Sequence, residues 1–464
     1  MVFRWLARIT LSALSIGFPV AGVVAAGAAA PPFPEAGREV LPADDGFAAA
    51  PTAELPLGTT GGSNAGPSRT AIVTNRAELI AALRYPDSTP KLIYVKGRID
   101  ANVDDANAPL SCRDYARPDP MTGEPYSLFA FLAMYDPAGS WGKRPPTGGQ
   151  ENARAASLAA QQARVHIRVP PNTTLYGLGG DATIAGAWLD VLPTEKHGSH
   201  PMNVIIRNLT FEDTMDCFPE WSPDDGPTGE WNSRYDALVL HNATHVWIDH
   251  NRFADVRTRD ATQPTYFGHV YQVHDGLLDI VSESDFVTVS WNQFAAHDKT
   301  MLIGNDDDAV ADRDKLHVTL HHNLFENLGQ RTPRVRFGQV HVYDNLYRVD
   351  RETNYHSTWG VGTESQIFAE DNFFDMSRQY GPVEVIDAKK GTRITTRGNC
   401  WREGDACAPT DFVALWNKAF NPDLKPDAGW TPRLYGPASS AEPAERARQH
   451  VIDESGPGRV RNDK

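Results

Sequence analysis

One pattern recurs seven times between residues 204 and 401, and it constrains the fold more than any other feature of the sequence. Each copy has alternating apolar residues, then an asparagine, then an aromatic residue two or three positions further along. Successive asparagines are 43, 41, 31, 22, 27 and 27 residues apart, so loops of different length must project from one constant turn. The seven are Asn208, Asn251, Asn292, Asn323, Asn345, Asn372 and Asn399.

The repeated asparagine indicates a stack of coils. Alternating apolar residues predict short strands with one buried face. Asparagine tolerates the left-handed backbone conformation of a sharp bend, and its side chain can bond to the same position on the next coil. We therefore expect an all-β parallel β-helix, a solenoid with projecting loops and a few short helices, which holds an asparagine ladder beside a parallel aromatic stack. A β-sandwich also has many short strands, but it does not repeat one residue at one turn.

The first residues have the features of an export signal. Arg4 and Arg8 precede an apolar run from about Ile9 to Val24, which small residues follow. A membrane anchor is the alternative, but the run is short and contains Pro19. We therefore expect a signal peptide over residues 1–28 and a secreted, extracellular protein with no membrane partner.

Two further segments follow the signal. Residues 29–68 are rich in Ala, Pro, Gly and Thr without periodicity, which is typical of a flexible linker. Residues 69–464 are expected to form one β-helix domain with a C-terminal extension. Near its start, the pattern predicts a helix around Arg76 to Leu83, a strand from Lys91 to Ile99, and a loop with one helix over 143–164.

Four cysteines suit an oxidising destination and allow three pairings. Cys400 and Cys407 flank a short polar loop and are the preferred pair, which leaves Cys112 with Cys217. Two free buried thiols are the alternative.

The net charge of −15 limits the partners of the protein. A chain with this negative charge repels a nucleic acid, which is also negatively charged, so we expect no nucleic acid to bind. A polyanionic substrate would need a local basic patch or a bridging cation.

Five short motifs stand out in the second half of the chain. They are Val246-Trp-Ile-Asp-His250, Asp275-Gly-Leu-Leu-Asp279-Ile280, His297-Asp-Lys299-Thr-Met-Leu-Ile-Gly304, Leu320-His-His-Asn323 and Gln330-Arg331-Thr-Pro-Arg334-Val-Arg336-Phe-Gly338. Together with weaker likeness over residues 70–425, they resemble the pectate lyases of the large extracellular polysaccharide lyase family. The resemblance implies a right-handed parallel β-helix, dependence on Ca²⁺, and eliminative cleavage of polygalacturonate.

Three aspartates form the predicted metal site. Asp275 and Asp279 are four residues apart in a strand-like run and project from one face, and Asp236 has a comparable place one coil earlier. Neighbouring carboxylates repel each other unless a hard cation lies between them, and Ca²⁺ takes about six to eight oxygen ligands. The resemblance matches all three to the family's calcium ligands. Asp225 is a weaker candidate, for extra calcium bound with substrate, and an ordinary turn aspartate is the alternative.

Basic residues on two neighbouring coils form the predicted substrate site. Guanidinium groups can grip uronate carboxylates in a bidentate way, and Lys299 offers a compact charge. The resemblance matches Arg331 to the catalytic base, and Lys299 and Arg336 to residues that bind substrate. It gives Arg334 a structural role. Without the resemblance, a salt-bridge network with the aspartates would be an equal alternative.

The implied reaction is a β-elimination that removes the C5 proton of a uronate and expels the O4 oxygen, leaving a 4,5-unsaturated sugar. Calcium at the uronate carboxylate would stabilise charge that builds up in the transition state. Because arginine is normally protonated, neighbouring Ca²⁺, Lys299 and Arg336 would have to lower the pKa of Arg331, and an alkaline pH optimum would follow.

Other interpretations remain to be compared. His250, His297, His321 and His322 could indicate zinc or a general base, but we expect packing residues, since adjacent His321 and His322 point to opposite faces. A pectin lyase acting on esterified polymer without calcium should lack the aspartate cluster. A non-catalytic polygalacturonate-binding β-helix would tolerate loss of Arg331 or Lys299, yet both are present. We expect polygalacturonate as the partner of a monomer.

Overall fold

The computed structural model describes residues 33–193, 200–404, 406–432 and 441–460. The signal peptide expected over residues 1–28 lies outside the described residues. Within the described ranges, no helix combines the length and the apolar character that crossing a bilayer requires.

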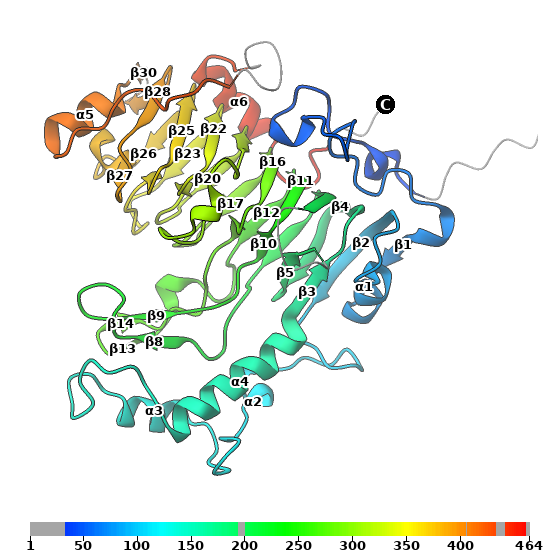
Figure 1. Cartoon of the computed structure of the whole chain (residues 1–464), viewed down its shortest axis with the longest axis vertical. Helices are drawn as coiled ribbons and strands as arrows, with labels where there is room; N and C mark the ends of the chain where they lie inside the picture. Colours follow the sequence, from blue (N-terminus) through cyan, green and yellow to red (C-terminus); the bar gives the residue numbers. More distant parts are fainter. Residues whose placement is uncertain (1–32, 194–199, 405, 433–440, 461–464) are drawn as a thin grey trace, which may run out of the picture. The chain divides into compact units, whose positions relative to one another are not determined.

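Residues 35–464 form one unit, a right-handed parallel β-helix whose coils run along three faces (Figure 1). The first and second faces belong to one sheet, because the long strands β2 and β4 pair with neighbours on both faces. The third face is a separate sheet of eight parallel strands. The predicted fold class is confirmed.

A complete inner coil contributes one strand to each face, whereas β2 and β4 each run through both the first and the second face. The first face contains β1 (Thr70–Val73), β2 (Lys91–Asp100), β4 (Thr173–Ala185), β6 (His200–Arg207), β11 (Ala243–Asp249), β16 (Asp285–Ser290), β19 (Val318–His321), β22 (Gln339–Tyr343), β25 (Gln366–Glu370) and β28 (Ile394–Arg397). The second face continues from β4 with β7 (Thr210–Glu212), β12 (Arg252–Ala254), β17 (Gln293–Ala295), β20 (Leu324–Glu326), β23 (Leu346–Val349), β26 (Phe373–Met376), β29 (Cys400–Glu403) and the antiparallel β30 (Ala406–Pro409). The third face contains β3 (His166–Val169), β5 (Trp188–Val191), β10 (Leu238–His241), β15 (Leu278–Val281), β18 (Leu302–Ile303), β21 (Arg334–Val335), β24 (Trp359–Val361) and β27 (Ile386–Ala388).

Helices and two small hairpins lie outside the coils. The helix predicted at Arg76–Leu83 is confirmed as α1, and the strand predicted from Lys91 is confirmed as β2. The single helix predicted within 143–164 is α4 (Gly149–Val165). The others are α2 (Cys112–Tyr115), α3 (Leu128–Met134), α5 (Phe412–Ala419) and α6 (Ala444–Glu454), with hairpins β8 (Glu220–Ser222) to β9 (Glu230–Asn232) and β13 (Thr265–Tyr266) to β14 (His269–Val270).

Six of the seven asparagines form one continuous ladder. The side-chain oxygen of each member after the first accepts the backbone N–H and the side-chain amide of the asparagine before it, at 2.8 to 3.1 Å. The members are Asn251, Asn292, Asn323, Asn345, Asn372 and Asn399, and all are fully buried. Because every donor and acceptor in the ladder needs its neighbour, the ladder holds adjacent coils at one height.

The expected backbone role of the asparagines is wrong in detail. The left-handed conformation belongs to the residue before each ladder asparagine, with φ between 51° and 64°, and not to the asparagine itself. Asn208 is the exception, because it has φ 62° and Leu209 occupies the ladder position, where its N–H donates to Asn251. The bend and the ladder are therefore carried by two consecutive residues, and the first copy of the pattern is displaced by one.

The predicted aromatic stack is confirmed beside the ladder. Seven rings on the second face succeed one another with centroids 4.7 to 6.1 Å apart and interplanar angles of 7° to 22°. Each ring fills the space above the next, so the stack excludes water from the ladder. The rings belong to Phe211, Phe253, Phe294, Phe325, Tyr347, Phe374 and Trp401.

We expected residues 29–68 to form a flexible linker. The described part of this segment instead packs against the β-helix. Residues 35–62 cross the outer side of the first face, and Leu41, Phe47 and Ala48 are buried. The Phe47 N–H donates to Thr319 Oγ1 at 3.0 Å, and the Ala48 N–H donates to Thr288 Oγ1 at 3.1 Å. The segment lacks strand periodicity because part of its backbone bonds to side chains of several coils, and not to another strand.

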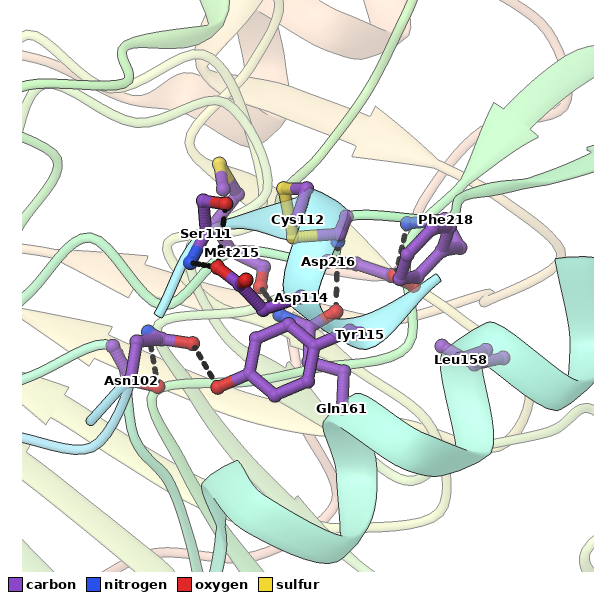
Figure 2. Close-up of a disulfide and its surroundings, with 12 residues drawn as sticks. Asn102, Ser111, Cys112, Asp114, Tyr115, Leu158, Gln161, Met215, Asp216 and Phe218 are labelled. Carbon is purple, nitrogen blue, oxygen red and sulfur yellow. Dashed lines mark hydrogen bonds between the residues drawn. A yellow bond between two sulfur atoms is a disulfide. The ribbon is translucent and has the colours of Figure 1, made fainter. Parts of the chain in front are cut away.

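Both preferred cysteine pairs are confirmed. Cys112 pairs with Cys217 and Cys400 with Cys407, with Cα atoms 5.3 and 5.6 Å apart. The first disulfide ties α2 to the loop after β7, beside α4 (Figure 2). Gln161 of α4 accepts the Cys217 N–H at 2.9 Å and donates to the Met215 carbonyl at 2.7 Å. This clamp orients the loop that leads towards the β8–β9 hairpin.

Replacing a central ladder member should destabilise the fold. Asn323→Ala removes the acceptor of two Asn292 donors, and an unsatisfied buried group costs about 1–3 kcal/mol, so we expect a loss on the order of 3 kcal/mol. Urea unfolding measures this loss. Asn152→Ala, on an exposed position of α4, is the matched control and should change the free energy of unfolding by less than about 0.5 kcal/mol. Equal effects of the two substitutions would contradict the role given to the ladder.

Candidate functional site

The three predicted aspartates converge at the entrance to the third face. Asp236 lies before β10, Asp279 is in β15, and Asp275 is in the turn that leads to β15. Asp236 and Asp279 are buried, whereas the Asp275 side chain is 32% exposed. Asp236 Oδ1 accepts the Gly276 N–H at 2.8 Å, and Asp279 Oδ1 accepts the Leu302 N–H at 3.0 Å. Neighbouring coils thus hold the carboxylates at fixed positions.

Gly276 leaves the space that the carboxylates occupy. A Cβ at this position would lie 2.4 Å from Asp279 Oδ1 and 2.9 Å from Asp236 Oδ1, so any side chain would collide with both. The sequence analysis quoted Gly276 in a motif but gave it no role. Its role follows from the close approach of two carboxylates to its Cα atom.

The cluster is electrostatically strained without a cation. Burial raises the pKa of Asp236 well above its usual value, and the charges of Asp279 and Asp275 raise this pKa further. Burial and the charge of Asp275 raise the pKa of Asp279 to about 7, although Arg331 opposes that rise. A set of oxygen donors that repel each other in this way suits a hard divalent cation such as Ca²⁺.

Lys299 and Arg331 lie on adjacent coils next to this cluster. A parallel bridge pairs Lys299 with Gln330, and the Arg331 carbonyl accepts the Met301 N–H at 2.8 Å. Lys299 Nζ is 3.9 Å from Asp275 Oδ1. Arg331 has a left-handed backbone, with φ 61°, and its buried Nε has no hydrogen-bond partner.

These side chains line an open cleft of about 540 Å³. Asp225 borders the same cleft, where its carboxylate accepts the side-chain amide of Asn232 at 3.2 Å. A second hollow of about 230 Å³ borders Asp275 and Arg234, and Asn232 lines both hollows. Asp275 therefore lines a hollow that adjoins, at Asn232, the cleft lined by Lys299 and Arg331. The remaining cleft residues include His269, Gln272, Asp298 and His356, which the sequence analysis did not single out.

Arg336 differs from Arg331 in its partners. Its Nε donates to Asp307 Oδ1 at 2.7 Å, and its Nη1 donates to the Gly304 and Asn305 carbonyls. Within the described part of the chain, no carboxylate forms an ion pair with Arg331. Arg336 is thus largely committed to the protein, whereas the Arg331 guanidinium is not.

Arg334 projects from the same strand as Arg336. Burial lowers the pKa of Arg334 to about 10, with a further contribution from the charges of Arg336 and Arg331. Its side chain packs against Gly360 on the next coil, where a Cβ would lie 2.7 Å from it. This packing agrees with the structural role expected for Arg334.

His297 contacts the backbone of the aspartate cluster, where we had expected a packing residue. Its Nε2 donates to the Asp275 carbonyl at 2.6 Å, and its Nδ1 donates to Asp255 at 2.5 Å. Burial alone would lower the pKa of His297, but the charge and hydrogen bond of Asp255 raise it to about 9. Both ring nitrogens carry hydrogen, so His297 fixes the Asp275 backbone and cannot itself ligate a metal. Spacing could not reveal this pair, because Asp255 is 42 residues away.

Comparisons with known proteins give consistent results. A family model described as pectate lyase matches residues 147–459. A pectate lyase of Bacillus subtilis (strain 168) is 38% identical over 454 residues, covering 97% of this chain and 98% of that protein. Pectate lyase E of Dickeya dadantii (strain 3937) is 34% identical, covering 74% of this chain and 72% of that protein.

Solved structures agree with the sequence comparisons. A thermostable pectate lyase superposes with a TM-score of 0.84 at 40% identity, covering 92% of this chain and 99% of that chain. A pectate lyase bound to a hexasaccharide superposes with a TM-score of 0.82 at 38% identity and the same coverage.

The strained carboxylates should make stability depend on pH. The Asp279 carboxyl binds its proton at about pH 7 in the metal-free native state but near pH 4 in the unfolded chain. Between these values the native state holds more protons, so its free energy of unfolding falls as pH rises through this window. Thermal unfolding of chelator-treated protein between about pH 5 and pH 8 measures the slope.

Asp279→Asn provides the comparison, because the amide keeps the shape and removes the charge. This variant should lose much of the slope, and added Ca²⁺ should stabilise the wild type at about pH 8 more than the variant. Asp350→Asn, on an exposed turn, should behave as the wild type. Parallel curves for wild type and Asp279→Asn would contradict the strain described above.

Proposed function

The chain belongs to the pectate lyase family and is an enzyme of that class, and from this premise we propose that it cleaves unesterified α-1,4-polygalacturonate by Ca²⁺-dependent β-elimination, leaving 4,5-unsaturated oligogalacturonates. One observation carries the proposal. The strained carboxylates Asp236 and Asp279, together with Asp275, lie beside a lysine and an arginine that line an open cleft.

Lys299 and Arg331 supply the local positive charge that an acidic protein needs to bind a polyuronate. The chain has a net charge of −15, so a polyanion would otherwise be repelled. Both side chains line the cleft of about 540 Å³, which is open enough to admit an extended polymer. Lys299 can pair with a uronate carboxylate as a point charge, and Arg331 can donate several hydrogen bonds.

Asp236, Asp275 and Asp279 would hold Ca²⁺. Their donor set is all oxygen, and their mutual repulsion is the property that a bound cation relieves. Bound Ca²⁺ would neutralise a substrate carboxylate and so make the neighbouring C5 proton more acidic. His297 keeps the Asp275 backbone in place for this role.

Arg331 would remove the C5 proton. It has no carboxylate partner within the described residues, and its left-handed backbone is held by the Met301 N–H. The aspartates would be committed to the cation, so they are poorly suited to act as the base. Because the step needs a deprotonated guanidine, turnover should rise towards alkaline pH.

The proposal extends to Arg336, to Asp225 and to the location of the protein. Arg336 would contact substrate through the Nη2 amino group that its internal bonds leave over. Asp225, at the edge of the cleft, would help to bind additional Ca²⁺ together with substrate. We also propose that a signal peptide directs the protein out of the cell and that the protein acts as a monomer.

The reaction type can be tested directly by ultraviolet absorbance, because only elimination creates a conjugated double bond. Incubation with polygalacturonate and Ca²⁺ should raise the absorbance, and a chelator should abolish the rise. Added excess Ca²⁺ should restore it. Full activity with excess chelator, or preference for methyl-esterified polymer, would favour a pectin lyase, and binding without any product would favour a non-catalytic β-helix.

Substitutions of the two cations should separate their roles. Arg331→Ala should lower kcat by at least about 100-fold with little change in KM, because proton transfer occurs only in the transition state. Lys299→Ala should raise KM as well as lower kcat, because a carboxylate contact already exists in the bound substrate. Arg348→Ala, on β23 and paired with Glu326, is the matched control and should retain activity. Near-normal kcat in Arg331→Ala would show that another group is the base.

A further inference from the structure

A second cluster of metal-ligand side chains lies at the turn between β19 and β20, away from the cleft residues. His322 follows β19, His450 is in α6, and Glu442 lies just before α6. One ligand atom from each lies within 4.8 Å of the others, and this is one of two such groups among the described residues. The other, Asp255, Asp260 and His297, is unsuitable because both nitrogens of His297 carry hydrogen.

The distances in the cluster are close to those of a coordinated ion. Glu442 Oε1 is 3.4 Å from His322 Nε2 and 2.7 Å from His450 Nδ1. Bonds of about 2.0–2.1 Å to a tetrahedral ion place two ligand atoms about 3.3–3.4 Å apart. The distance from Glu442 to His322 already has this value, and the distance from Glu442 to His450 would have to lengthen. The His450 side chain is 36% exposed on a surface helix, so it can make this shift.

His322 lies against a second histidine. His321 Nδ1 lies 2.9 Å from His322 Nδ1, so one of these two nitrogens carries the hydrogen of the contact. His321 Nε2 lies 2.9 Å from Asp45 Oδ1 but forms no hydrogen bond with a described residue. When His322 donates through Nδ1, its Nε2 carries a lone pair that faces Glu442 and can ligate a cation.

The surroundings support a bound cation further. Arg446 holds the other carboxylate oxygen of Glu442 at 3.0 Å, and the Glu442 N–H donates to Asp344 at 3.1 Å. The Asp344 carboxylate is also 3.8 Å from His322 Nε2. The Trp291 ring stacks on His322 with centroids 4.1 Å apart, which fixes the plane of the imidazole. Outer contacts of this kind orient the ligands in protein metal sites.

We propose that His322, Glu442 and His450 bind a divalent cation of the zinc class and thereby pin the C-terminal helix to the coils. Two imidazole nitrogens and one carboxylate oxygen suit Zn²⁺ or Co²⁺ and do not suit Ca²⁺, which takes oxygen ligands. α6 covers apolar side chains of the second face, and Ala444 and Val451 pack on Leu346 and Phe373. The cation would add a link between α6 and the turn of the asparagine ladder at His322.

Co²⁺ binding tests the proposal, because Co²⁺ absorbs visible light when nitrogen and oxygen ligands surround it. The probe is Co²⁺ titrated into the full chain without an affinity tag, stripped of metal and kept in excess Ca²⁺ to saturate the aspartate cluster. We expect one equivalent to bind with a visible spectrum. Zn²⁺ should displace it and should raise the thermal unfolding midpoint of the wild type.

Variants decide whether the named side chains are the ligands. His450→Ala, at a partly exposed position, and Glu442→Gln should each weaken Co²⁺ binding by at least about tenfold and remove the Zn²⁺-dependent rise in midpoint. Gln449→Ala, on the exposed side of α6, should bind as the wild type. No visible spectrum with excess Co²⁺, or equal binding in His450→Ala and wild type, would overturn the proposal.

Discussion

The hydrogen bond between one asparagine and the next is the interaction on which the rest of the structure depends. The six ladder members are fully buried, and each member after the first accepts two hydrogen bonds from the member before it. A slip of one residue would leave these groups unpaired and bring the wrong side chains into the core. The ladder therefore fixes the height of every coil. Asp236 and Asp279 are 43 residues apart in sequence, yet both approach the Cα atom of Gly276, because their coils are held in register.

The electrostatics of the site depend on how many internal hydrogen bonds and ion pairs each charged residue forms, and this number differs between residues of the same type. Arg336 donates three hydrogen bonds, one to Asp307 and two to backbone carbonyls, whereas Arg331 has no ion pair among the residues described. The same inequality holds for the carboxylates, since Asp255 pairs with His297, whereas Asp236 forms no ion pair among the described residues and accepts the Gly276 N–H. Groups without an internal ion pair remain available to a ligand, and Arg331 lies in the cleft close to the aspartates. The coil that supplies each group decides which partners it can reach.

Sequence reasoning was most successful where one residue type repeats. The coil fold, the aromatic stack and both disulfides could be predicted, because each depends on spacing or on elimination within a small set. The left-handed residue could not be located, since His250, Trp291 and Asp344 share no side-chain chemistry and are united only by backbone geometry. The docking of residues 35–62 was missed because threonines far along the chain satisfy their backbone. His297 was underestimated for the same reason, as its partners come from other coils.

The two terminal segments change how the solenoid can come apart. In a simple solenoid each repeat contacts only its neighbours, so unfolding can begin at one end and proceed coil by coil. Here the N-terminal segment bonds to Thr174, Thr288 and Thr319, and the tail after α6 returns to Trp291 and Asn208. Each segment therefore bridges coils that do not touch one another. The coils from β4 to β19 therefore cannot separate without breaking a bridge, so we expect this part of the solenoid to unfold as one cooperative unit.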